Sequence, residues 1–143
     1  MKISRTSIKL IRETTIEYNK NQIKNINDIA KLIDNLEDIQ NLDVENAFIV
    51  CLNNQNEPVN YSLISKGAIS CSIIDPKTIF KNILLSNASG FIMIHNHPSG
   101  NATPSKEDFK ITELLKNASK LLDIKFLDHV IIGNNSYISC MDV

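Results

Sequence analysis

Apolar and polar positions form distinct blocks along the 143-residue chain, and most blocks predict either a strand or a helix. Residues 48–52 and 59–65 are apolar runs on either side of the turn-forming stretch 53–58, which indicates a β-hairpin. A weakly alternating edge strand is expected at 4–14. Further strands are expected at 68–74, 91–94, 126–132 and 136–140.

Three other segments carry apolar residues at helical spacing. The first spans residues 27–36, with Asn27 as its predicted N-cap. The second begins at Asp75-Pro76, an N-cap followed by proline at the first helical position, and Gly90 is expected to close it. The third begins at Ser105. Strands and helices together predict an α+β type of α/β fold, with helices flanking a mixed, largely antiparallel sheet.

Composition argues against several classes of function. The 15 basic and 16 acidic residues give a net charge of −1, without the clustered basic surface that nucleic-acid binding usually requires. No apolar run approaches the roughly 20 residues of a membrane span, and the charged N-terminus is unlike a signal peptide. Three cysteines without a C-x-x-C pair are typical of reduced thiols. We therefore expect a cytoplasmic protein whose partner is neither nucleic acid nor membrane.

The stretch from His95 to Asp108 holds the residues with recognisable chemistry. His95 and His97 follow a buried strand two residues apart, so both side chains should point to one face. The loop that leads to Ser105 is long enough to fold the next helix back over the strand end, which would bring Asp108 to the histidines. Two histidines and one carboxylate form the protein ligand set of a catalytic zinc site, whose fourth position is kept for water.

Each part of this stretch also has a purely structural interpretation. Ser105 and Asp108 resemble a capping box with aspartate in place of the usual glutamate or glutamine, and the two histidines could flank a surface turn. Both parts together, in this order after a buried strand, favour a metal site, and a capping role for Ser105 is compatible with catalysis. The third histidine, His129, is interpreted as a buried, hydrogen-bonded structural residue near the sheet edge.

The four residues His95, His97, Ser105 and Asp108 have the spacing H-x-H-x7-S-x2-D. This spacing matches the signature of the JAMM metalloproteases, also called JAB or MPN+ proteins. The segments HNHPSGNATPSKED and LDHVIIG resemble one branch more closely, the RadC family, and this similarity covers roughly residues 43–139. The resemblance implies a JAB/MPN-like fold with a cytidine-deaminase-like architecture.

The same resemblance implies an activity, the zinc-dependent hydrolysis of a peptide or isopeptide bond in a protein or peptide substrate. It implies that Ser105 hydrogen-bonds the reacting oxygen. It also implies a general-base glutamate just before the first core strand, a place that Glu45 occupies, while Glu57 in the turn is the weaker candidate. One zinc ion per chain would be held by His95, His97 and Asp108.

Two features depart from the family pattern. No glycine-containing helix-hairpin-helix pattern precedes Asn41, so residues 1–40 are expected to form a strand and helix extension packed on a stand-alone JAB-type zinc domain at 41–143. Pro76-Lys77-Thr78 replaces the usual Pro-Arg-Glu. Two other functions compete with hydrolysis, a non-catalytic zinc-containing protein-interaction module and a DNA-repair-associated factor. A zinc nucleoside deaminase would need H-x-E and P-C-x-x-C, which the sequence lacks.

Overall fold

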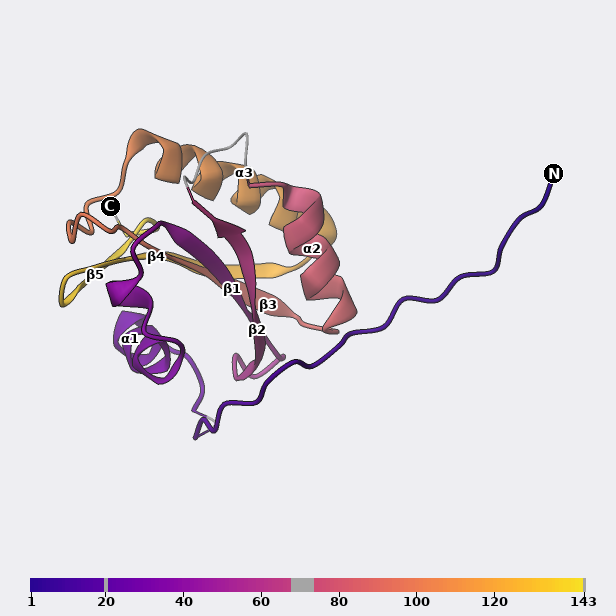
Figure 1. Cartoon of the computed structure of the whole chain (residues 1–143), viewed down its shortest axis with the longest axis horizontal. Coiled ribbons are helices and arrows are strands. Elements are labelled where there is room, and N and C mark those ends of the chain that lie inside the picture. Colours follow the sequence, from indigo (N-terminus) through magenta and orange to yellow (C-terminus); the bar gives the residue numbers. More distant parts are fainter. Residues whose placement is uncertain (20, 68–73, 143) are drawn as a thin grey trace.

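The computed structural model describes residues 1–19, 21–67 and 74–142 (Figure 1). The strands are β1 (Asn46–Leu52), β2 (Pro58–Lys66), β3 (Gly90–Asn96), β4 (Lys125–Gly133) and β5 (Ser136–Ser139). They form one sheet with the order β2-β1-β3-β4-β5, and among the described strands only the β3–β4 pair is parallel. The prediction of a mixed α/β fold with a largely antiparallel sheet is therefore confirmed.

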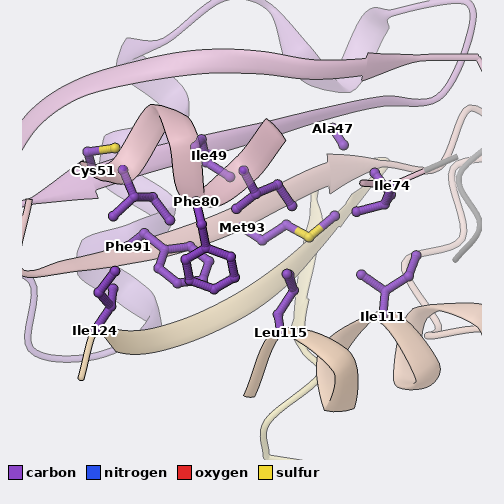
Figure 2. Packing of buried hydrophobic residues seen from close by; sticks show 12 residues of the cluster. Ala47, Ile49, Cys51, Ile74, Phe80, Phe91, Met93, Ile111, Leu115 and Ile124 are labelled. Carbon is purple, nitrogen blue, oxygen red and sulfur yellow. The ribbon is translucent and has the colours of Figure 1, made fainter. Parts of the chain in front are cut away.

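Helices cover both faces of this sheet (Figure 1). The helical segments are α1 (Ile26–Asn35), the 3₁₀ helix η1 (Ile39–Asn41), α2 (Pro76–Leu85) and α3 (Lys106–Leu122). On one face lie α2 and α3, whose buried side chains, such as Ile79 and Ile111, join those of Ile49 and Met93 in one core cluster. This cluster is shown in Figure 2, where Phe80 and Phe91 meet edge to face. On the other face, buried side chains of α1 belong to a second cluster.

The hairpin and the three helices agree with the prediction, but two predicted boundary residues are wrong. Asn25, not Asn27, caps α1, because its side chain accepts the backbone N–H groups of residues 27 and 28. Gly90 does not close α2, which ends at Leu85, but begins β3. A Cβ atom at Gly90 would lie 2.8 Å from the Lys125 carbonyl oxygen, so the close approach of β4 requires glycine there.

The predicted strand at 4–14 is wrong. These residues have no regular secondary structure and add no strand to the sheet (Figure 1). Ile8 and Ile11 are exposed there, since two or three apolar positions give too little buried surface to hold an edge strand in place. The strand expected at 68–74 lies, except for Ile74, outside the described residues.

Two further observations concern membrane-spanning helices and the cysteine thiols. Among the described residues, none of the helices combines the length and apolar character needed to cross a membrane. The cysteines Cys51 and Cys140 are buried free thiols. Burial raises the pKa of the Cys140 thiol to about 12, so this thiol is protonated at neutral pH.

Candidate metal centre

The sheet places the two signature histidines at the end of β3 with their rings on one side. His95 is the penultimate residue of the strand and is fully buried, whereas His97 follows the strand and is partly exposed. Their Nε2 atoms are 3.1 Å apart. The alternation of side chains along the strand therefore brings the two imidazoles to one point, as the sequence predicts.

Asp108 reaches the same point from the first turn of α3. Its Oδ1 atom lies 3.1 Å from Nε2 of His95, and its Oδ2 atom lies 3.4 Å from Nε2 of His97. The three side chains form a cluster able to bind a metal ion. In a tetrahedral zinc site with bonds of about 2.0–2.1 Å, neighbouring ligand atoms are about 3.3 Å apart, close to these spacings. The cluster therefore fits a small tetrahedral cation.

The hydrogen bonds around His97 leave its Nε2 lone pair available for a metal. Its Nδ1 atom lies 2.7 Å from the carbonyl oxygen of Asn101, and a carbonyl oxygen only accepts, so Nδ1 carries the ring hydrogen. In the neutral imidazole the Nε2 atom then has a lone pair directed toward Asp108 and His95. A nitrogen lone pair and a carboxylate that face each other favour a cation between them.

Charge interactions within the cluster shift the pKa values in the direction that suits a cation site. The pKa of His97 is raised, chiefly because the protonated ring can donate a hydrogen bond to Asp108, and the negative charge of Glu45 adds to the shift. Burial alone would raise the pKa of Asp108, but its interactions with protonated forms of the two histidines outweigh burial and lower the value well below the usual range. The Asp108 carboxylate is therefore ionised across the physiological range.

Ser105 and Asp108 form a complete capping box at the start of α3. The Ser105 Oγ atom accepts the Asp108 N–H at 3.2 Å, and the Ser105 N–H donates to Asp108 Oδ2 at 2.6 Å. The capping interpretation is therefore confirmed, and it also has a consequence for the site. The bond to Oδ2 fixes the plane of the carboxylate, which directs Oδ1 toward His95.

Glu45 directly precedes β1, and the antiparallel register pairs Ala47 with His95. Extending this register by two residues brings Glu45 beside His97, in agreement with the effect of its charge on the His97 pKa. The competing candidate Glu57 follows the other end of β1, where it accepts a hydrogen bond from the Asn53 side chain. Of the two glutamates, the structure brings only Glu45 to the cluster.

Asn96, between the two histidines, points to the opposite side of the strand and holds the segment that carries Glu45. Its Oδ1 atom accepts the Asn46 N–H at 2.8 Å, and its Nδ2 group donates to the Val44 carbonyl at 3.1 Å. Glu45 thus lies between Val44 and Asn46, whose backbone groups are hydrogen-bonded to the Asn96 side chain of β3.

His129 is buried and hydrogen-bonded, as predicted, but it also contacts the cluster, which the sequence did not reveal. Its Nε2 atom lies 2.8 Å from Nδ1 of His95, and its Nδ1 atom lies 2.7 Å from Oγ1 of Thr112. Burial lowers the pKa of His129 to about 3, so this ring is neutral. Thr112 is the residue of this group that sequence reasoning missed. One turn separates it from Asp108 on α3, the spacing that puts two side chains on one helix face.

Comparison with known proteins agrees with this geometry. Residues 23–142 match the family described as the RadC-like JAB domain. A UPF0758 protein of Desulfitobacterium hafniense is 42% identical over 112 residues, which are 78% of this chain and 48% of that protein. A UPF0758 protein of Methanosarcina barkeri is 35% identical over 130 residues, 91% of this chain and 56% of the relative. The chain spans about half the length of these relatives. It belongs to the RadC family of JAB-domain proteins.

Proposed function

We propose that the cluster of His95, His97 and Asp108 binds one zinc ion and that the protein is a JAMM-type hydrolase of peptide or isopeptide bonds. The observation that carries the proposal is the convergence of three ligand atoms at tetrahedral spacing beside a glutamate that is not one of them. Zinc suits two imidazoles and one carboxylate, and three protein ligands are the number found in catalytic zinc sites.

The position of each ligand also defines the direction from which a substrate arrives. His95 and Asp108 are almost fully buried, whereas the side chain of His97 is 13% exposed. The cluster therefore reaches solvent on the His97 side, and the β1–β3 register, extended by two residues, supports a position of Glu45 on that side. A scissile bond entering there would meet the glutamate first.

Each remaining residue then has a role in the proposed reaction. A zinc ion held by His95, His97 and Asp108 would lower the pKa of a water molecule and supply a positive charge that polarises the scissile carbonyl. Glu45 takes the proton of the attacking water and delivers it to the leaving nitrogen, the work of a general base that becomes a general acid. The Ser105 hydroxyl oxygen accepts the Asp108 N–H, which leaves its own hydrogen available to donate to the developing oxyanion.

A peptide-library assay tests the proposed activity. Protein loaded with zinc is expected to cleave a subset of a randomised peptide and isopeptide-linked library, with products identified by mass spectrometry. Stripping the metal with a chelator should abolish cleavage, and stoichiometric zinc should restore it. Cleavage that survives metal removal would contradict the zinc mechanism. A stoichiometric zinc protein that cleaves neither class would support the non-catalytic interaction module instead.

Ser105 gives a further prediction, because the capping bond and the proposed oxyanion contact use the same hydroxyl. Ser105→Ala should lower stability by about 1 kcal/mol through loss of the cap. It should also lower turnover by roughly 10²–10³, with zinc retained. Ser105→Asp should recover the melting temperature without recovering activity, since an ionised carboxylate cannot donate a hydrogen bond. Thermal melting, zinc content and cleavage rate are measured on the same preparations. Activity that simply follows the melting temperature across Ser105→Ala, Ser105→Asn and Ser105→Asp would reduce Ser105 to a cap.

A further inference from the structure

A chain of hydrogen bonds runs from α3 through β4 to the buried ligand His95. The Thr112 hydroxyl donates to the Asp108 carbonyl at 2.7 Å, in the same helix. The same oxygen lies 2.7 Å from His129 Nδ1, and His129 Nε2 lies 2.8 Å from His95 Nδ1. All three side chains are buried, so bulk water does not compete for these bonds.

The donor and acceptor at each step follow from the first bond. A hydroxyl has one hydrogen, and Thr112 gives it to the Asp108 carbonyl, so toward His129 it acts as an acceptor. The hydrogen between Thr112 and His129 therefore belongs to His129 Nδ1. In the neutral ring, His129 Nε2 has the lone pair and accepts from His95 Nδ1. His95 then presents its Nε2 lone pair to the metal position, the tautomer that a zinc ligand needs.

We propose that His129 and Thr112 are positioning residues that lock His95 in its metal-binding tautomer and ring orientation. This inference rests on the zinc site proposed above. The partner of a ligating imidazole is commonly a carboxylate, a backbone carbonyl or water. Here His97 uses the backbone carbonyl of Asn101, whereas His95 uses a second histidine whose own tautomer is fixed by a threonine.

The sheet explains why these residues meet. β4 lies parallel to β3, and the register pairs Met93 with His129, so the two histidines share one face of neighbouring strands. The α3 helix connects these strands and crosses the same face, which places Thr112 over His129. One helix thus supplies both the ligand Asp108 and the far end of the hydrogen-bond chain.

Zinc affinity of variants, measured by competition with a chromophoric chelator, tests the proposal without any assay of activity. His129→Leu removes the acceptor for His95 and is expected to weaken zinc binding about 10–100-fold. His129→Gln can offer an amide oxygen near the former Nε2 position and should recover part of the loss. Val130→Ala is the matched control, because this neighbour is buried in the cluster on the other face. It should cost stability and leave zinc affinity unchanged.

The Thr112 variants test the remote end of the chain with a smaller disturbance of the fold. Thr112→Val keeps the shape but removes the acceptor that fixes the His129 tautomer, so zinc affinity should fall about 10-fold. Thr112→Ser keeps the hydroxyl and should bind like the wild type. The double variant His129→Leu with Thr112→Val should bind zinc no more weakly than His129→Leu alone, since both substitutions break the same series of hydrogen bonds. The visible spectrum of bound Co²⁺ should change in Thr112→Val and not in Thr112→Ser.

The outcomes separate this inference from the proposed function. A wild-type protein that binds no stoichiometric zinc would remove the metal site itself. Wild-type zinc binding combined with unchanged affinity in His129→Leu and Thr112→Val would overturn the positioning role alone. A loss of affinity in Val130→Ala as large as in His129→Leu would do the same, because it would trace the effect to general loosening of β4.

Discussion

His95→Ala is expected to reduce the zinc content of the purified protein from about one ion per chain to a trace. Three protein ligands hold a catalytic zinc, and removal of a fully buried one leaves only His97 and Asp108. His97→Ala should have the same effect. Elemental analysis of protein purified without chelator measures the content directly. Added zinc should raise the melting temperature of the wild type and leave that of both variants unchanged, since only a bound ligand stabilises the fold.

The strand that carries the histidines also provides a control for this prediction. Ile94 precedes His95 on β3 and is equally buried, but its side chain lies in the core cluster on the other face. Ile94→Val should cost about 0.5–1.5 kcal/mol of stability and keep a full complement of zinc. Wild-type protein without stoichiometric metal, or His95→Ala protein that still holds it, would be incompatible with the proposed ligand set.

The parts of the site that local rules govern could be predicted from the sequence. Alternation along a strand is enough to put His95 and His97 on one side. Capping preferences are enough to start a helix at Ser105, and a helix start fixes where Asp108 lies relative to it. These rules depend on neighbours within about one turn or one strand, so they remain valid before the fold is known.

The contacts missed by the sequence depend on how distant segments pair. The bond between His129 and His95 requires β4 to lie parallel to β3 in one particular register, and a one-residue shift would turn His129 to the other face. The contact with Thr112 requires α3 to cross that face. The same limit applies to Glu45, whose place beside His97 follows from the β1–β3 register and not from any motif around it.

Boundary errors in the fold have a similar origin. Asn25 and Asn27 are equally good caps by residue type, and the choice between them depends on where α1 must begin to bury Ile29, Leu32 and Ile33. Gly90 follows a helix, which is where a closing glycine is expected. Its actual reason for being glycine is the nearby Lys125 carbonyl, on a strand that enters much later in the chain.

Glu45→Gln is expected to abolish turnover while zinc stays bound. The amide has the shape of the carboxylate but cannot take the proton of the attacking water, and loss of such a base costs typically 10²–10⁴ in rate. Zinc content should remain at about one ion per chain, because Glu45 is outside the cluster of His95, His97 and Asp108. The cleavage rate of a peptide selected with wild-type protein from the library measures the first effect, and elemental analysis measures the second.

Glu57→Gln is the matched control for this separation of binding from turnover. It makes the same chemical change at the other end of β1, where the carboxylate accepts a hydrogen bond from Asn53 and is remote from the cluster of His95, His97 and Asp108. Zinc content and cleavage rate should both stay near the wild-type values. Full activity in Glu45→Gln would show that another group takes the proton. Loss of zinc in Glu45→Gln would instead make Glu45 part of the metal site, because only a group that contributes to holding the ion can release it when its charge is removed.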